Sequence, residues 1–149
     1  MSHLHIDSSH KIYIAGFSLG GLSALDISLN HPNIFSGVGV FSGALWWRDR
    51  PFQAKRPNAH LIIPQKIHLS HHVPNIKYWF LAGTLEETND RDKNGIIDVI
   101  DDTLNTIVSL QRAGVSPKNI SYVEVKGGKH QWQTWAKAMP RFLMTICAS

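Results

Sequence analysis

Two kinds of hydrophobic pattern alternate along the chain, and they predict alternating strands and helices. Short continuous runs of apolar, β-branched and aromatic residues are typical of buried strands, and they occupy residues 11–15, 38–41, 76–82 and 120–125. Apolar residues spaced three and four positions apart predict helices, which we place from about Leu19–Gly20 to Asn30, over 98–113 and over 133–146. The alternation favours an α/β fold, with a mostly parallel sheet flanked by helices.

The last predicted helix has a clear apolar side. This side carries Trp135, Met139, Phe142, Leu143 and Ile146. Pro140 lies inside the same helix and is expected to kink it, because proline cannot donate the backbone hydrogen bond of a helix.

Residues 44–75 break the pattern, because prolines interrupt them at four positions and no period survives. We predict a long connection with one short helix, and connections of this length usually cover a functional site. Trp46 and Trp47 follow the second predicted strand directly. They would either line an acyl or aromatic pocket or pack in the core or a lid, and we favour the packing role.

Composition narrows the class of protein. A chain of 149 residues with 43% hydrophobic residues fits a single globular domain over 1–149. The net charge is +4 and the basic residues are scattered, so we predict no nucleic-acid partner. No stretch reaches the roughly 18 apolar residues of a membrane span, so no membrane partner is predicted. The single cysteine excludes an intrachain disulfide, and the first residues show no secretory pattern.

The segment Gly16-Phe17-Ser18-Leu19-Gly20 joins the first strand to the first helix. A Gly-x-Ser-x-Gly match is weak alone, but at a strand-to-helix turn it predicts a nucleophile elbow that exposes the Ser18 hydroxyl. The glycines at 16, 20 and 21 are expected to remove Cβ atoms that would clash there. The backbone N–H of Leu19, at the helix start, would donate to a developing oxyanion.

A serine hydroxyl needs a base, and that base needs an orienting acid. The third strand is followed by Gly83-Thr84-Leu85-Glu86-Glu87, and the fourth by Gly127-Gly128-Lys129-His130. Carboxyl ends of parallel strands form the ligand-binding edge of open α/β sheets, and the chain order Ser, acid, His suits an α/β-hydrolase. We therefore predict a triad of Ser18, Glu86 and His130, with Glu87 as the alternative acid. His71 and His72 lack nearby ligands and are interpreted as loop residues.

Residues 90–101 match the spacing of a calcium-binding loop. Glycine stands at the sixth position, and oxygen donors stand at the first, third, fifth, ninth and twelfth, namely Asp90, Asp92, Asn94, Asp98 and Asp101. The alternative is an acidic turn in which Asp98 caps the next helix. A structural Ca²⁺ would hold the Glu86–Glu87 loop in place, and no cofactor is required for the predicted catalysis.

With these motifs, His31-Pro32-Asn33-Ile34-Phe35, Gly37 to Gly43 and Trp135, the chain resembles the putative esterase family of α/β-hydrolases. That family includes feruloyl esterases, enterochelin-esterase-like proteins and S-formylglutathione hydrolase. The resemblance implies hydrolysis of a small-molecule carboxylic ester through an acyl-enzyme, with acyl transfer as a variant. By position it gives the nucleophile to Ser18, the general base to His130 and the acid to Glu86.

The chain differs from that family on the N-terminal side of the nucleophile strand. Family members have further strands and helices before the nucleophile strand, and these include the loop with the second oxyanion donor. About ten residues precede the strand here, so we expect a partial α/β-hydrolase fold that lacks the N-terminal strands and resembles the C-terminal half. Absent strands expose a sheet edge, which a second copy or another partner would cover. The alternatives to an active esterase are a truncated, weakly active or non-catalytic fragment and a calcium-stabilised binding module.

Overall fold

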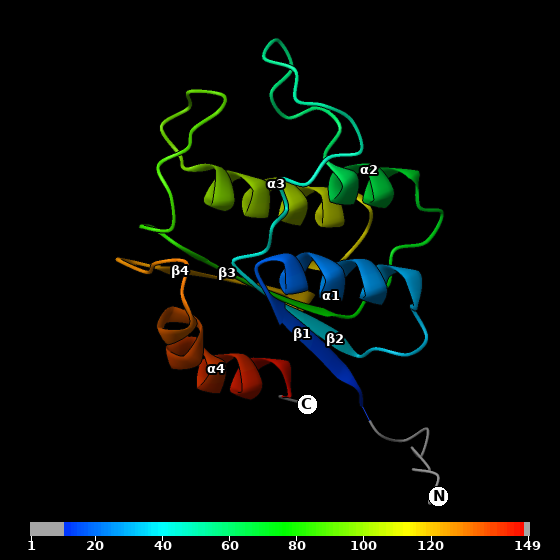
Figure 1. Ribbon diagram of the computed structural model, residues 1–149. Helices are drawn as coiled ribbons and strands as arrows, with labels where there is room; N and C mark the ends of the chain where they lie inside the picture. The colour runs from blue at the N-terminus through cyan, green and yellow to red at the C-terminus, as the bar shows by residue number, and fades with distance from the viewer. Residues whose placement is uncertain (1–10, 148–149) are drawn as a thin grey trace, which may run out of the picture.

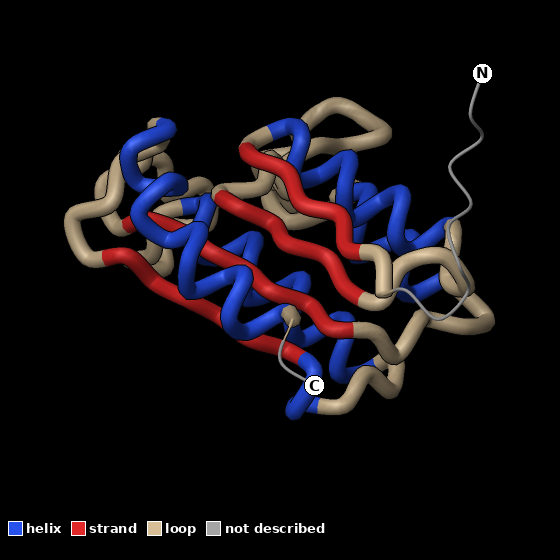
Figure 2. Tube along the Cα trace, turned by 90° about the horizontal axis from the view of Figure 1, so that it is seen from below, coloured by secondary structure: helices blue, strands red, loops and turns tan. Residues whose placement is uncertain are grey.

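In the computed structural model, residues 11–147 are described, and they form a four-stranded parallel sheet between helices (Figure 1). The strands are β1 (Tyr13–Phe17), β2 (Gly37–Phe41), β3 (Lys77–Gly83) and β4 (Ile120–Val125). Each strand pairs in parallel with the next one along the chain, in the order β1-β2-β3-β4 (Figure 2). All four carboxyl ends therefore lie along one edge of the sheet.

The helices cover both faces of the sheet. Figure 1 shows α1 (Leu19–Asn30), α2 (Ile62–Leu69) and α3 (Asp98–Arg112) on one face and α4 (Trp132–Ile146) on the other. A short 3₁₀ helix, Pro117–Asn119, leads into β4. Over residues 11–147 no helix has the length and apolar character that crossing a membrane requires.

The predicted elements are present, and none of their ends is shifted by more than two residues. The first strand was predicted to stop before Gly16, but Gly16 and Phe17 continue it by pairing with Val40 and Phe41. The predicted short helix of residues 44–75 is α2. The prediction that Leu143 lies on the apolar side of the last helix is wrong, because Leu143 is 49% exposed. Each helical residue is rotated about 100° from the one before, which turns Leu143 away from the buried Phe142.

Both faces of the sheet are packed, so its strands read as continuous apolar runs. Every residue of β2 is buried. On the face of α4, Phe142 makes edge contacts with Phe41 and Trp79 at ring-centroid distances of 5.3 Å. Gly39 permits this approach, because a Cβ on that residue would lie 2.4 Å from the Phe142 ring.

The close packing of α4 on β2 predicts that Gly39→Ala lowers the free energy of unfolding. The added methyl forces Phe142 out of place, and overpacking of this kind costs about 1–3 kcal/mol. Urea unfolding followed by circular dichroism measures the change. Gly20→Ala is the matched control, because nothing lies within 4 Å of a Cβ at Gly20. An unchanged stability of Gly39→Ala would show that α4 is not packed as described.

Candidate active site

Polar side chains follow the carboxyl ends of all four strands. Ser18 comes directly after β1 and Ser42 directly after β2, while Glu86 and His130 lie in the loops after β3 and β4. Because the strands are parallel and in register, these residues converge at one edge of the sheet. The structure thus brings together the three predicted residues Ser18, Glu86 and His130, and it adds Ser42.

Ser18 occupies the sharp turn between β1 and α1. Its backbone has φ 54° and ψ −122°, a strained conformation for a residue with a side chain and one expected at a nucleophile elbow. A Cβ at Gly16 would lie 2.0 Å from the carbonyl oxygen of Gly20, and a Cβ at Gly21 would lie 3.1 Å from that of Gly16. A Cβ at Gly20 would meet nothing within 4 Å, so the predicted packing role is wrong for Gly20.

Ser18 and His130 are joined by a hydrogen bond. The distance from Ser18 Oγ to His130 Nε2 is 2.9 Å, and that from His130 Nδ1 to Glu86 Oε2 is 2.8 Å. A carboxylate can only accept, so the ring proton belongs on Nδ1, and Nε2 accepts from the Ser18 hydroxyl. Ser18 Oγ makes no capping bond to the helix, although serine is a frequent N-cap. Its hydroxyl is therefore directed at the imidazole.

Glu86 is buried, with 1% of its side chain exposed. Its Oε1 accepts hydrogen bonds from the backbone N–H of Gly83 and from Ser42 Oγ, the latter at 2.6 Å. Glu87 points elsewhere: its Oε1 accepts from the backbone N–H of Val99 in the first turn of α3, at 2.7 Å. His130 is therefore hydrogen-bonded to Glu86, whereas Glu87 accepts the hydrogen bond of the Val99 backbone N–H.

The N–H of Leu19 lies at the first position of α1, directly after Ser18. The amides of Gly21 and Leu22 both donate to the carbonyl oxygen of Ser18. The Leu19 amide has no hydrogen-bond acceptor within the described part of the chain. It is therefore free to donate to an oxygen bound near Ser18.

A cavity of about 370 Å³ opens over Ser18 and His130. Its lining also includes Ser42, Trp46 and Trp47. The two indoles lie against each other at a centroid distance of 5.2 Å and are 48% and 43% exposed. A buried core position for this tryptophan pair is therefore wrong, and the pair forms part of the cavity wall.

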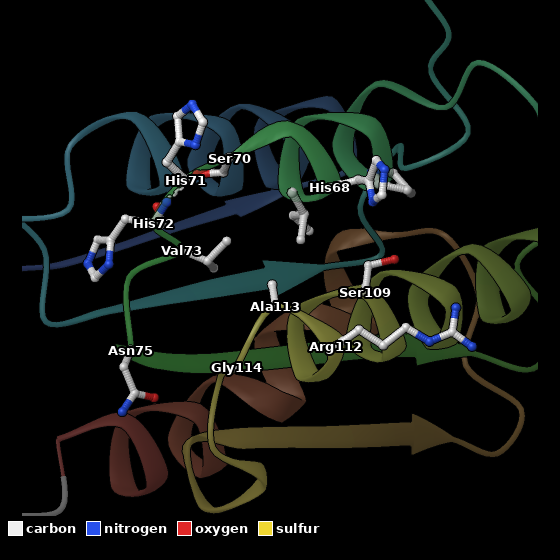
Figure 3. A pocket seen from close by; sticks show the side chains of 12 residues that line it. His68, Ser70, His71, His72, Val73, Asn75, Ser109, Arg112, Ala113 and Gly114 are labelled. Atoms are coloured by element: carbon white, nitrogen blue, oxygen red, sulfur yellow. Dashed lines mark hydrogen bonds between the residues drawn. The ribbon is translucent and has the colours of Figure 1, made fainter.

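A second cavity, of about 460 Å³, lies at the opposite end of the sheet, near the segment that leads into β3 (Figure 3). Its lining includes His68, His71 and His72, whose imidazoles point in different directions in Figure 3. His71 and His72 lie in a loop, as the sequence predicted. This larger cavity contains none of the triad residues and takes no part in the site.

The predicted calcium donors make hydrogen bonds within the protein. Asp90 accepts from the backbone N–H groups of Asn94 and Gly95, which lower its pKa. Asp92 accepts from the side-chain amide of Asn58, and Asn94 accepts from the backbone N–H of Ile96. Asp98 accepts from the backbone N–H of Arg91 and forms an ion pair with its guanidinium at 3.4 Å. Burial, followed by the charge of Asp92, raises the pKa of Asp101. Residues 11–147 contain no group of three or more His, Cys, Asp or Glu arranged to hold a metal ion, so the geometry lends the calcium site no support.

Arg91 supplies a positive charge at the start of α3. Its guanidinium hydrogen-bonds to both carboxylate oxygens of Asp102, whose side chain is 1% exposed. Burial raises the pKa of Asp102, and the hydrogen bond and charge of Arg91 oppose this rise. The alternative in which Asp98 caps the helix is wrong, because the N-cap is Ile97 and Glu87 accepts the hydrogen bond of the Val99 backbone N–H.

Calcium binding at residues 90–101 therefore stays a prediction of the loop motif alone. The motif predicts that millimolar calcium raises the melting temperature, by binding the folded state, and that Asp90→Ala removes the rise. Differential scanning fluorimetry with calcium, and with magnesium as the control ion, measures this. An unchanged melting temperature would rule the metal out and leave Arg91 as the charge partner of these carboxylates.

Sequence reasoning did not identify two polar members of the site. Ser42 Oγ donates to Glu86 and accepts from Trp135 Nε1 at 2.8 Å. Trp135 was placed on the apolar side of its helix, and Ser42 was included only in the segment Gly37 to Gly43, with no role given to it. A polar residue directly after a buried strand, at the same sheet edge as Ser18, was the available signal.

Comparisons with known proteins show which family and which fold the chain matches. The family described as Putative esterase matches residues 1–146. None of the curated proteins is similar enough in sequence to match the chain. Solved structures do match it, and each of the three named below is aligned over 90% of this chain.

Three of these solved structures are esterases or related hydrolases. An enterobactin esterase from Shigella flexneri, in the presence of 2,3-Di-hydroxy-N-benzoyl-serine, has a TM-score of 0.68 at 22% identity over 30% of its length. A ferulic acid esterase matches with a TM-score of 0.62 at 18% identity, over 51% of its length. S-formylglutathione hydrolase from Staphylococcus aureus matches with a TM-score of 0.57 at 19% identity, over 50% of its length. The chain thus has the fold of α/β-hydrolase esterases and spans about a third to a half of their length.

Proposed function

The chain belongs to the Putative esterase family, and from this premise we propose that it hydrolyses a carboxylic ester through an acyl-enzyme formed on Ser18. The family and the esterase fold support ester hydrolysis. The observation that carries the finer proposal is the chain of hydrogen bonds from Ser18 through His130 to Glu86, with distances of 2.9 Å and 2.8 Å. Nucleophile, base and acid stand in the relation that acyl transfer requires.

In the proposed first half-reaction, Ser18 Oγ attacks the ester carbonyl carbon while its proton passes to His130 Nε2. The carbonyl electrons move to the oxygen, and the Leu19 N–H donates to the resulting oxyanion. The intermediate collapses, the bond to the alcohol oxygen breaks, and this oxygen takes the proton from His130. The acyl group then remains on Ser18, and the ionised Glu86 stabilises the imidazolium during both transfers.

In the second half-reaction, a water molecule takes the place of the alcohol. His130 removes its proton, the water oxygen attacks the acyl carbon, and Ser18 leaves with the proton returned from His130. The products are a carboxylic acid and the free enzyme. An acceptor alcohol in place of water would give acyl transfer by the same steps.

For the substrate, we propose an ester with an aromatic group that lies against Trp46 and Trp47. These two indoles form an exposed wall of the cavity that contains Ser18. The names of two similar structures refer to ferulic acid and to a dihydroxybenzoyl-serine compound, both of which carry an aromatic ring. Aromatic rings pack favourably in offset or edge arrangements, so such a wall would favour a planar acyl group.

We also propose that further polypeptide, or a second copy of the chain, covers the free edge of β1. Among the described residues β1 pairs with β2 alone, which leaves the backbone groups on its other side without a strand partner. Such a polypeptide matters for catalysis, because an oxyanion site that lacks one of its donors typically loses about 10²–10³-fold in turnover. A polypeptide at this edge, next to the Ser18 turn, is well placed to supply a donor in addition to Leu19.

The proposed function predicts that Ser18→Ala abolishes esterase activity. Without the hydroxyl no acyl-enzyme forms, and kcat for p-nitrophenyl acetate should fall by on the order of 10⁴-fold or more. Release of p-nitrophenolate, followed by absorbance, measures this. Ser23→Ala is the matched control, since Ser23 is an exposed serine of α1, the helix that begins directly after Ser18. Equal activity in the Ser18→Ala variant and the wild type would exclude Ser18 as the nucleophile.

The two neighbouring glutamates give a second test. Glu86→Gln removes the charge opposite the imidazolium and should lower kcat by about 10²–10⁴-fold. Glu87→Gln keeps an oxygen that can accept from Val99 N–H and should leave kcat nearly unchanged. Steady-state kinetics of both variants, purified side by side, decide between the two carboxylates. The reverse result would move the acid from Glu86 to Glu87.

A further inference from the structure

We infer that Trp135 and Ser42 are positioning residues that fix the carboxylate of Glu86 toward His130. This inference rests on the proposed function, because it describes how the acid of that same site is held. Ser42 lies directly after β2 and Trp135 lies in α4, so a strand of the sheet and a helix that covers one of its faces both contribute to holding the carboxylate. Ser42 Oγ is the atom at which they join.

The direction of each proton follows from the chemistry of the groups. The indole N–H of Trp135 can only donate, so Ser42 Oγ must accept from it, at 2.8 Å. The Ser42 hydroxyl proton is then free for Glu86 Oε1, at 2.6 Å. The carboxylate can only accept, so the indole, the hydroxyl and the carboxylate form a chain with one consistent direction. Such chains polarise each bond in them, which strengthens the hold on the carboxylate.

These hydrogen bonds leave the second carboxylate oxygen of Glu86 for the histidine. Oε1 is occupied by Ser42 and by the backbone N–H of Gly83, and Oε2 faces His130 Nδ1. Rotation of the carboxylate would break both bonds to Oε1 in a buried place, where unpaired polar groups are costly. The orientation that keeps the Nδ1 proton of His130 in position is thereby fixed.

Trp135 also contacts the histidine itself. Its ring meets the His130 ring edge to face, at a centroid distance of 5.2 Å and an interplanar angle of 87°. The same indole stacks on Phe17 at 5.2 Å, which holds it in place. One side chain therefore sets the plane of the imidazole through its ring and the carboxylate through its N–H.

The backbone of Ser42 supports a functional role for its hydroxyl. Its φ of 49° lies in the left-handed region, which glycine adopts easily and serine does not. The residue is 1% exposed, and its N–H donates to the carbonyl oxygen of Leu81 at 2.8 Å. Glycine would satisfy the backbone at this position with less strain, so the serine is explained by what its hydroxyl does.

The test compares Ser42→Ala, Ser42→Gly and Trp135→Phe with a matched control, Trp132→Phe. Trp132 is a 68% exposed residue at the start of the same helix. Trp135→Phe keeps an aromatic ring that can face Phe17 and His130, and it removes the indole N–H together with part of the ring surface. For p-nitrophenyl acetate, kcat of the three site variants should fall by about 10- to 100-fold with KM little changed, because misplacement of the acid by an ångström suffices for such losses.

Two features of the kinetics separate positioning from general structure. Ser42→Ala combined with Trp135→Phe should lose less kcat than the two single losses multiplied together, since the indole N–H reaches Glu86 only through the hydroxyl. Ser42→Gly relieves the backbone strain, so a purely structural serine would leave this variant with full kcat. Wild-type kcat in Ser42→Gly and in Trp135→Phe would overturn the inference.

Proton NMR keeps this inference distinct from the proposed function. The Nδ1 proton of His130, held by a carboxylate, should give a downfield resonance that shifts or disappears in Ser42→Ala and Trp135→Phe but not in Trp132→Phe. An inactive wild type with this pattern would refute the esterase proposal and leave the positioning intact. A resonance that is unchanged in Ser42→Ala and Trp135→Phe would overturn the positioning whatever the activity.

Discussion

A buried carboxylate must have its hydrogen bonds satisfied by the protein, and Glu86 imposes this requirement on the whole site. Its partners come from the end of β3, from the residue after β2, and from the loop between β4 and α4. The loop and the sheet thus contact the same carboxylate, and α4 is connected to it through the hydrogen bond from Trp135 to Ser42. The arrangement orients His130, and through it Ser18.

The parallel sheet makes this convergence possible. In a parallel sheet with neighbouring strands in register, every strand ends at the same edge, so residues far apart in the chain meet there. Close packing around the sheet then restricts the backbone. Gly16 admits the turn at Ser18, and Gly39 admits Phe142 of α4 against β2, so the helix that carries Trp135 lies close to the site.

Local patterns predicted most of the elements and the convergence of Ser18, Glu86 and His130, for a physical reason. Strands buried on both faces appear as unbroken apolar runs. A Ser, an acid and a His that follow three strands of one parallel sheet meet because parallel strands end at the same edge. Contacts that depend on tertiary geometry were not visible in the same way. Ser42 and Trp135 are 93 positions apart, and the sequence around each residue does not predict the hydrogen bond between them. The exposed Leu143, the cavity-facing Trp46 and the engagement of Asp98 by Arg91 are decided by packing that the spacing of residues does not encode.

The central claim is that Ser18 is a nucleophile activated by His130. Incubation with a fluorophosphonate probe, followed by intact-mass and peptide mass spectrometry, measures this without knowledge of the natural ester. The account predicts one modification, located on Ser18, that forms far more slowly when His130 is replaced by alanine. A folded wild-type protein that stays unlabelled, or that is labelled at another residue, would contradict the account.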